Sequence, residues 1–280
     1  MINQQKTISK NIKFSGIGLH TGEPVEITLM PSDTDSGISF MINNKKIKAS
    51  WKNAEVSQLC TKLMTKNVQL STIEHLMSAL SGLGITNLNI KTTSSEMPIL
   101  DGSSKDFVEM IIKAGITIQK KKKKILKVKK ILSYEQSNKY IKISPIENEQ
   151  LVIDYTIDYK DDFIKKQSLI YKHSDKNYKN IYKARTFCLH QDLEKIFSMG
   201  LAKGGSLDNA IVVSGNKILN QGGLRYENEF VKHKVLDCIG DLYLSEYSIY
   251  GKISTYGGGH ELNLMLLRKI FSNQNNYDII

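Results

Sequence analysis

The sequence predicts an α+β fold built from two similar halves. Segments that alternate apolar and polar residues are interrupted by a few helix-like segments, and the second half of the chain repeats the order of the first. Aligning EHLMSALSGL with KHKVLDCIGDL places His75 opposite His233, as expected for a duplicated fold whose two copies face each other. With 280 residues, the chain is long enough for two domains that each bury a core.

The first half should begin as an antiparallel sheet, because ISKNIKFSGIGLHTGEPVEITLMP alternates in polarity and is broken by glycine and proline. STIEHLMSALSGLG follows, with apolar residues at helical spacing and glycines that supply a stop. A strand, ITNLNI, and a second helix, SKDFVEMIIKAGI, complete this half. The helix is predicted to end at Gly115.

A run of lysines, Lys120–Lys124, marks the expected domain boundary, giving domains of residues 1–120 and 121–280. Such a run is usually a solvated linker or an edge strand. Strands are predicted in ILKVKKILSY, KYIKISP, LVIDYTIDY and SLIY. A long helix, EFVKHKVLDCIGDLYL, and a terminal helix from His260 onward end the chain.

Composition is that of a globular protein, with 40% hydrophobic and 24% charged residues. No apolar run approaches the ~20 residues that span a bilayer, and MINQQKTISK lacks the apolar core of a secretion signal, so we expect a cytoplasmic protein. The formal net charge of +11 suits an anionic partner such as a nucleotide, a phospholipid surface or RNA, although a lysine-rich genome would produce the same charge without any ligand.

Three acidic or imidazole side chains share one face of the predicted helix around position 233. His233, Asp237 and Asp241 follow one another at intervals of four residues. Two ligands at such spacing, with a third from elsewhere, are what an open catalytic zinc site needs. The alternative is a surface helix with an ordinary His–Asp pair, and the HExxH signature is absent.

Glu74 and His75 open the other helix and point to different sides of it. One can bind a metal while the other serves the attacking water. Two alternatives remain open at this point: Glu74 can complete a capping box with Ser71, and His75 can be an ordinary packed histidine. His260 is a further candidate, because Gly257–Gly259 in front of it let a substrate approach closely.

Several segments together resemble one enzyme family. STIEHLMSALSGLG, EMPILDGSS, KARTF, GLAKGGSLDNAIVV, LRYENEFVKHKVLDCIGDLYL and the GGGH turn are similar, in order and spacing, to UDP-3-O-acyl-N-acetylglucosamine deacetylases. The resemblance covers nearly the whole chain. It implies two similar domains, each a β-sheet layered with α-helices, whose helix layers face each other around the active site, with small inserts. It also implies one Zn²⁺ per chain, held by His75, His233 and Asp237.

The resemblance assigns the acid–base groups as well. Glu74 would be the general base that takes a proton from the attacking water. Thr186 would help the metal to stabilise the oxyanion. His260 would support the oxyanion and protonate the departing amine, while Asp241 would hold and charge-pair its imidazole; Glu74 acting as both base and acid is the alternative.

Substrate contacts are expected from three further residues. By the same resemblance, Lys234 would contact the substrate and Phe187 would pack on it, whereas Tyr159 falls where an aromatic ring could stack on uracil. An insert near residues 184–212 would shelter the acyl chain with Leu193, Ile196, Phe197, Met199 and Leu201. Cys188 departs from the family, which usually has glycine there.

The implied reaction is hydrolysis of the N-acetyl group of UDP-3-O-acyl-N-acetylglucosamine to UDP-3-O-acyl-glucosamine and acetate, the committed step of lipid A biosynthesis in Gram-negative bacteria. The implied partner is this UDP-linked acyl amino sugar, with no nucleic acid and no transmembrane segment, a possible transient contact with the inner membrane, and a monomeric protein. An RNA-binding protein and a deacetylase for another nucleotide sugar are the competing hypotheses.

Overall fold

The structure is a computed structural model that describes residues 3–280. The first of its two main sheets has five strands in the order β2-β3-β9-β4-β5. All pairs are antiparallel except β4 with β9. Inward side chains alternate with outward ones along β3, as the sequence pattern predicts. The strands are β2 (Ile12–Ile17), β3 (Pro24–Pro31), β4 (Ile38–Ile42), β5 (Lys45–Lys48) and β9 (Leu88–Thr92).

The second main sheet has seven strands and is organised around the long strand β19 (Ser248–Tyr256). On one side β19 pairs with β13 (Lys139–Ser144), which pairs with β12 (Leu132–Gln136). On the other side it runs parallel to β11 (Ile125–Val128) and to β14 (Leu151–Asp158). The sheet is completed by β15 (Lys166–Lys172) beside β14 and β20 (Tyr277–Ile279) beside β11.

The two sheets repeat one topology. In the first sheet, the order is β2-β3-β9-β4-β5, and every neighbouring pair is antiparallel except β9 with β4. The second sheet contains the order β12-β13-β19-β14-β15, in which every neighbouring pair is antiparallel except β19 with β14. The parallel pair thus occupies the same place in both. A helix precedes and follows the central strand in both cases. These helices are α1 (Glu74–Leu83) and α2 (Lys105–Ala114) around β9, and α5 (Glu229–Leu242) and α6 (His260–Phe271) around β19. The α+β fold and the repeat thus agree with the sequence pattern.

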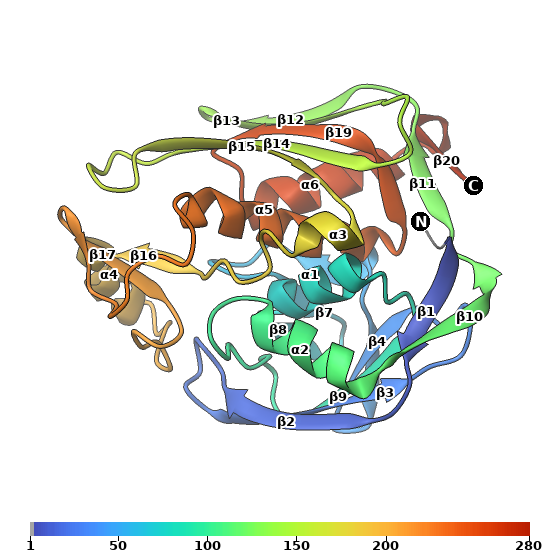
Figure 1. Cartoon of the computed structure of the whole chain (residues 1–280), viewed down its shortest axis with the longest axis horizontal. Helices are drawn as coiled ribbons and strands as arrows, with labels where there is room; N and C mark the ends of the chain where they lie inside the picture. Colours follow the sequence, from blue (N-terminus) through green and yellow to red (C-terminus); the bar gives the residue numbers. More distant parts are fainter. Residues whose placement is uncertain (1–2) are drawn as a thin grey trace.

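Helices lie between the two main sheets, where α1 and α5 pack directly against each other (Figure 1). Both helices are buried along most of their length, including their polar residues. Leu76 and Leu80 of α1 and Val235 and Ile239 of α5 belong to one continuous apolar core. Polar side chains on these helices are therefore held in a rigid, dry environment.

The remaining strands of residues 3–280 form small separate sheets. Lys120–Lys122 belong to the edge strand β10 (Ile116–Lys122), which pairs with β1 (Gln4–Ile8). A three-stranded sheet comprises β6 (Ala54–Glu55), β7 (Lys62–Met64) and β8 (Gln69–Ser71). Another comprises β16 (Phe187–Leu189), β17 (Ile211–Ser214) and β18 (Lys217–Ile218). The remaining helices are α3 (Asp175–Tyr178), α4 (Leu193–Ser198) and the short 3-10 turns Trp51–Asn53, His190–Asp192, Tyr243–Ser245 and Gln274–Asn276.

The capping box considered for Glu74 is wrong. Helix α1 begins at Glu74 itself, with Ile73 in the capping position and no side-chain cap. Ser71 ends strand β8, and its hydroxyl donates to the carbonyl of Ser95 at 3.3 Å. The carboxylate of Glu74 is thereby left for another role.

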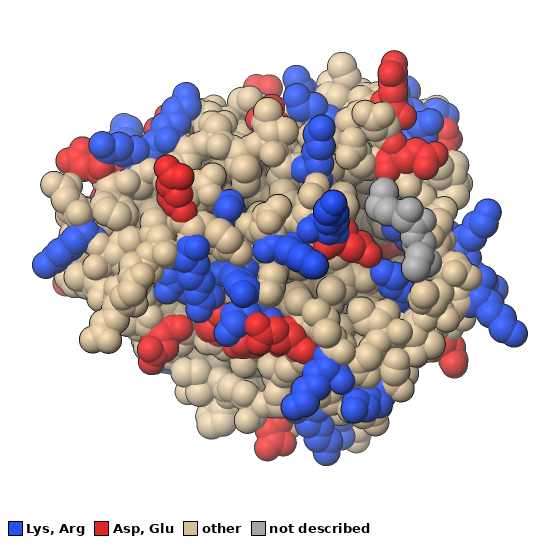
Figure 2. Space-filling view, in the orientation of Figure 1, with Lys and Arg blue, Asp and Glu red and all other residues tan. Residues whose placement is uncertain are grey.

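Charges of both signs occur together on the face shown in Figure 2, where Lys and Arg are interleaved with Asp and Glu and form no unbroken basic surface. Among the helices of residues 3–280, none has the length and apolar character needed to cross a membrane.

Candidate metal centre and active site

Three side chains that can bind a metal meet where α1 crosses α5. His75 comes from the first turn of α1, whereas His233 and Asp237 lie one turn apart on α5. Asp237 Oδ1 is 3.7 Å from His75 Nε2 and 3.4 Å from His233 Nε2. One ligand atom from each residue lies within 4.8 Å of the others, and all three residues are buried.

The hydrogen bonds of the cluster leave ligand atoms of Asp237 and His233 free to bind a metal ion. Asp237 Oδ1 is buried and has no hydrogen-bond partner within residues 3–280, which is costly unless something else satisfies it. His233 Nδ1 donates to the carbonyl of Ala184 at 3.0 Å, so its Nε2 is left with a lone pair that points at the cluster. Two imidazole nitrogens and one carboxylate oxygen form a donor set typical of catalytic zinc.

The protonation states also suit metal binding. Burial lowers the pKa of His75, and it lowers the pKa of His233 to about 3 despite the opposing charge of Asp237. Both imidazoles are therefore neutral near pH 7. Burial acts to raise the pKa of Asp237, but His233 and Lys234 hold it well below its usual range. Lys234 Nζ donates to Asp237 Oδ2 at 3.1 Å.

A second cluster, of acid–base groups, lies beside the first. His260 Nε2 is 3.9 Å from Glu74 Oε1, and His260 Nδ1 is 2.8 Å from Asp241 Oδ2. Burial raises the pKa of Glu74 to about 7. Burial opposes the charged form of His260, but the charge and hydrogen bond of Asp241, followed by Glu74, raise its pKa to about 9. A base and a protonated acid near neutral pH thus face the same space.

The cavity beside these clusters has a volume of about 620 Å³ and is lined by both polar and apolar side chains. Its polar lining includes His260, Lys139, Lys234 and Thr186. Its apolar wall comes largely from the predicted insert, which the structure forms from β16, α4 and β17. Of the apolar residues predicted for the insert, Leu193, Ile196 and Phe197 line the cavity, whereas Met199 and Leu201 do not; Cys188 also lines it.

The remaining residues predicted to contact the substrate lie near the cavity, but not all of them line it. Thr186 directly precedes β16, and Phe187 opens that strand; both line the cavity. Lys234 Nζ lies 5.7 Å from the centre of the Phe187 ring. Tyr159 packs edge-on behind Phe187, with ring centres 5.6 Å apart, and is not among the lining residues.

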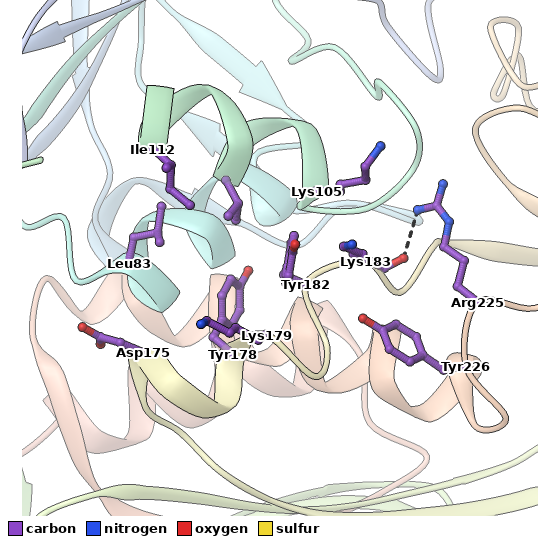
Figure 3. Close-up of a pocket in the computed structure, with 11 residues that line it drawn as sticks. Leu83, Lys105, Ile112, Asp175, Tyr178, Lys179, Tyr182, Lys183, Arg225 and Tyr226 are labelled. Carbon is purple, nitrogen blue, oxygen red and sulfur yellow. Dashed lines mark hydrogen bonds between the residues drawn. The ribbon is translucent and has the colours of Figure 1, made fainter. Parts of the chain in front are cut away.

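Two arginine side chains hold the segment that carries Thr186 in place. Arg185 forms a buried ion pair with Glu229 at 2.9 Å. Arg225 Nη1 donates to the carbonyl of Lys183 at 3.0 Å (Figure 3) and to Asp101 Oδ2 at 2.6 Å. These bonds fix the carbonyl of Ala184, which in turn orients His233. The larger cavity in Figure 3, about 760 Å³, lies on the far side of this segment.

Sequence reasoning missed two residues of the acid–base cluster. Thr61 contacts Glu74, Asp241 and His260 from a loop, and Asn263 Nδ2 donates to Asp241 Oδ2 at 2.7 Å. Asn263 stands three residues after His260, a helical spacing that places both side chains on one face of α6 and could have indicated it. Thr61 has no comparable signal.

Comparison with known proteins identifies the family of enzymes to which the chain is similar. A family model described as UDP-3-O-acyl N-acetylglycosamine deacetylase matches residues 5–272. The UDP-3-O-acyl-N-acetylglucosamine deacetylase of Campylobacter jejuni (strain RM1221) is 42% identical over 280 residues, which covers 99% of this chain and 95% of that protein. The enzymes of the same name from Campylobacter fetus subsp. fetus (strain 82-40) and Psychrobacter sp. (strain PRwf-1) are 41% and 39% identical, with the same coverage.

Proposed function

Because the chain belongs to the UDP-3-O-acyl N-acetylglycosamine deacetylase family, we propose that it hydrolyses the N-acetyl group of UDP-3-O-acyl-N-acetylglucosamine in lipid A biosynthesis. The products are UDP-3-O-acyl-glucosamine and acetate. The observation that carries this proposal is the buried cluster of His75, His233 and Asp237 beside a cavity lined by both polar and apolar side chains. An acylated nucleotide sugar likewise has polar and apolar parts.

The proposed metal is a single zinc ion held by His75, His233 and Asp237. When bound there, zinc would polarise the acetamide carbonyl and lower the pKa of the attacking water towards ~7. Since two neutral imidazoles and one ionised carboxylate are available, the site needs no rearrangement of charge to accept the ion.

The protein's own groups then move the protons. Glu74 takes a proton from the attacking water, which a carboxylate with a pKa near 7 does efficiently at neutral pH. The hydroxyl of Thr186 donates to the oxyanion that develops on the carbonyl oxygen. His260, protonated and held by Asp241, gives its proton to the departing amine.

The substrate would lie along the cavity. Lys234 offers a positive charge to the anionic part of the nucleotide sugar, and the ring of Phe187 packs on it. The acyl chain occupies the apolar wall formed by Leu193, Ile196 and Phe197. For Tyr159 a stacking role requires the site to rearrange, because Tyr159 packs on Phe187 and is not among the residues that line the cavity.

The proposed context is a cytoplasmic monomer with two domains divided near Lys120–Lys124, which touches the inner membrane transiently. Phe197 and Met199, 54% and 42% exposed, support the membrane contact because they are apolar side chains left exposed on the insert that lines the cavity. Co-sedimentation with anionic vesicles, with and without both residues changed to serine, tests it. Sedimentation equilibrium tests the monomer.

The function is tested by measuring bound zinc and deacetylation in the same preparations. The purified protein should hold about one zinc and release acetate, and chelation should abolish the activity until zinc is restored. His233→Ala and Asp237→Asn should lose both metal and turnover, whereas Asp162→Asn, the same charge change at an exposed position, should keep both. Bound zinc without turnover on this substrate would redirect the search to other nucleotide sugars. Salt-sensitive RNA binding with no zinc would instead support the binding-protein hypothesis.

A further inference from the structure

Thr61 occupies a point where three helices converge. It lies in the loop that leads into β7, and only 6% of its surface is exposed. Two residues earlier, Leu59 adopts a left-handed backbone conformation with φ of +62°. Such a conformation is unfavourable for a branched residue and is usually maintained where it serves a site. It brings Thr61 against the N-terminus of α1, the last turn of α5 and the first turn of α6.

The main chain of Thr61 orients the proposed base. Its N–H donates to Glu74 Oε2 at 3.1 Å. The other oxygen of that carboxylate, Oε1, is the one that lies 3.9 Å from His260 Nε2. Holding Oε2 through the amide therefore directs Oε1 towards the space that His260 also faces, where the attacking water would give up its proton.

The side chain of Thr61 orients the proposed acid. Its hydroxyl donates to Asp241 Oδ1, and Oγ1 lies 3.0 Å from His260 Nδ1. Since Asp241 Oδ2 accepts from His260 Nδ1, the proton on Nδ1 lies between Asp241 and Thr61. The exchangeable proton of the imidazolium is then the one on Nε2, which faces Glu74.

From these contacts we propose that Thr61 is a positioning residue that fixes Glu74 and the Asp241–His260 pair in one geometry. Its amide serves the base and its hydroxyl serves the acid, so a single residue couples the two. Removal of the hydroxyl lets the Asp241 carboxylate rotate and the imidazole tilt, without any change to the metal ligands. This inference rests on the proposed deacetylase function.

The test compares Thr61→Val, which keeps the shape and loses the hydroxyl, with Thr61→Ser, which keeps the hydroxyl and loses a methyl group. Valine should lower kcat by about 10–100-fold with KM changed by less than about threefold and zinc content unchanged, and serine should remain near the wild type. Thr7→Val is the matched control, because Thr7 is also buried and hydrogen-bonded but lies in β1, away from the site. It should keep full kcat.

Either of two results would overturn the inference: Thr61→Val within about threefold of wild-type kcat, or a loss in Thr61→Ser as large as in Thr61→Val. The second would mean that packing of the methyl group matters and the hydroxyl does not. If Thr61→Val does not fold, Thr61→Ala replaces it and must again fall below Thr61→Ser. An inactive wild type with bound zinc would instead count against the deacetylase function itself.

Discussion

The α-carbon of Gly240 on α5 faces the main-chain carbonyl of Glu74 on α1 so closely that a β-carbon at position 240 would lie 2.2 Å from that oxygen. No side chain fits between the two helices at this point. The absence of one is what allows His75 to reach His233 and Asp237.

Gly240→Ala should therefore separate the two helices. We expect a loss of about 1–3 kcal/mol in stability from overpacking and a fall in zinc affinity of about 10-fold because the ligands move apart. Thermal unfolding and zinc titration measure these effects. Gly82→Ala is the control: its β-carbon would overlap the Tyr178 ring, not α5, so it should cost stability and spare zinc affinity. Equal zinc affinity in both variants would contradict the argument.

Asp241→Asn should change the pH dependence of activity. The charge of Asp241 helps to raise the pKa of His260 to about 9, so its removal lowers that pKa. If protonated His260 is the acid, the alkaline limb of the kcat/KM profile moves to lower pH by about one unit. His260→Ala should lose that limb altogether. An unmoved alkaline limb in both variants would support Glu74 as the sole acid–base group.

Glu229→Gln should destabilise the protein strongly. The side chain of Glu229 is fully buried, and its loss of charge leaves Arg185 buried without a counter-ion. Such a change costs about 3–5 kcal/mol in the free energy of unfolding. Zinc affinity should fall too, because Ala184 next to Arg185 orients His233. The control is Glu55→Gln, which removes a half-exposed partner of Arg268 and should cost under about 1 kcal/mol in denaturant titrations.

His173 should make the fold sensitive to acid. Burial lowers its pKa from 6.5 to about 4 in the folded protein. The unfolded chain therefore binds the proton more tightly, so stability is complete above about pH 6.5 and decreases towards pH 4 by up to about 3 kcal/mol. His173→Gln, which can still bond to Ser81, should remove this part of the decrease. Parallel pH dependences of unfolding free energy for the two proteins would refute this assignment.

Ala210→Phe should distinguish substrates by acyl-chain length. Ala210 lines the apolar part of the cavity, so a larger ring there occupies the space proposed for the chain. We expect KM to rise about 10-fold or more for a long-chain substrate and little for a short-chain one, with kcat preserved. Steady-state kinetics with both substrates measure these values of KM and kcat. A uniform rise in KM would place the acyl chain elsewhere.

The sequence predicts most of the fold because its periodic segments are long. The helices α1 and α5 and the end of α2 at Gly115 follow from spacing and glycine placement. The candidate ligands are also visible in the sequence, since His233 and Asp237 share a helix face. Ser71 misleads because the chain forms a strand up to this residue, where a capping box would have started the helix two residues earlier.

What the sequence could not indicate depends on contacts between distant segments. Thr61 reaches Asp241 across 180 residues from an irregular loop, where no periodicity fixes the direction of a side chain. Tyr159 is aromatic and packs against Phe187, yet only Phe187 lines the cavity. Tertiary packing alone decides which of two neighbouring rings faces the cavity.

The three side chains of the candidate metal centre come from helices in opposite halves of the chain. An ion bound by all of them favours only the state in which both halves are folded and in contact, so its binding free energy adds to the stability of the whole molecule. When the ion is scarce, a larger fraction of molecules opens and becomes available to proteases. The supply of metal would then set the lifetime of this protein as well as its rate of turnover.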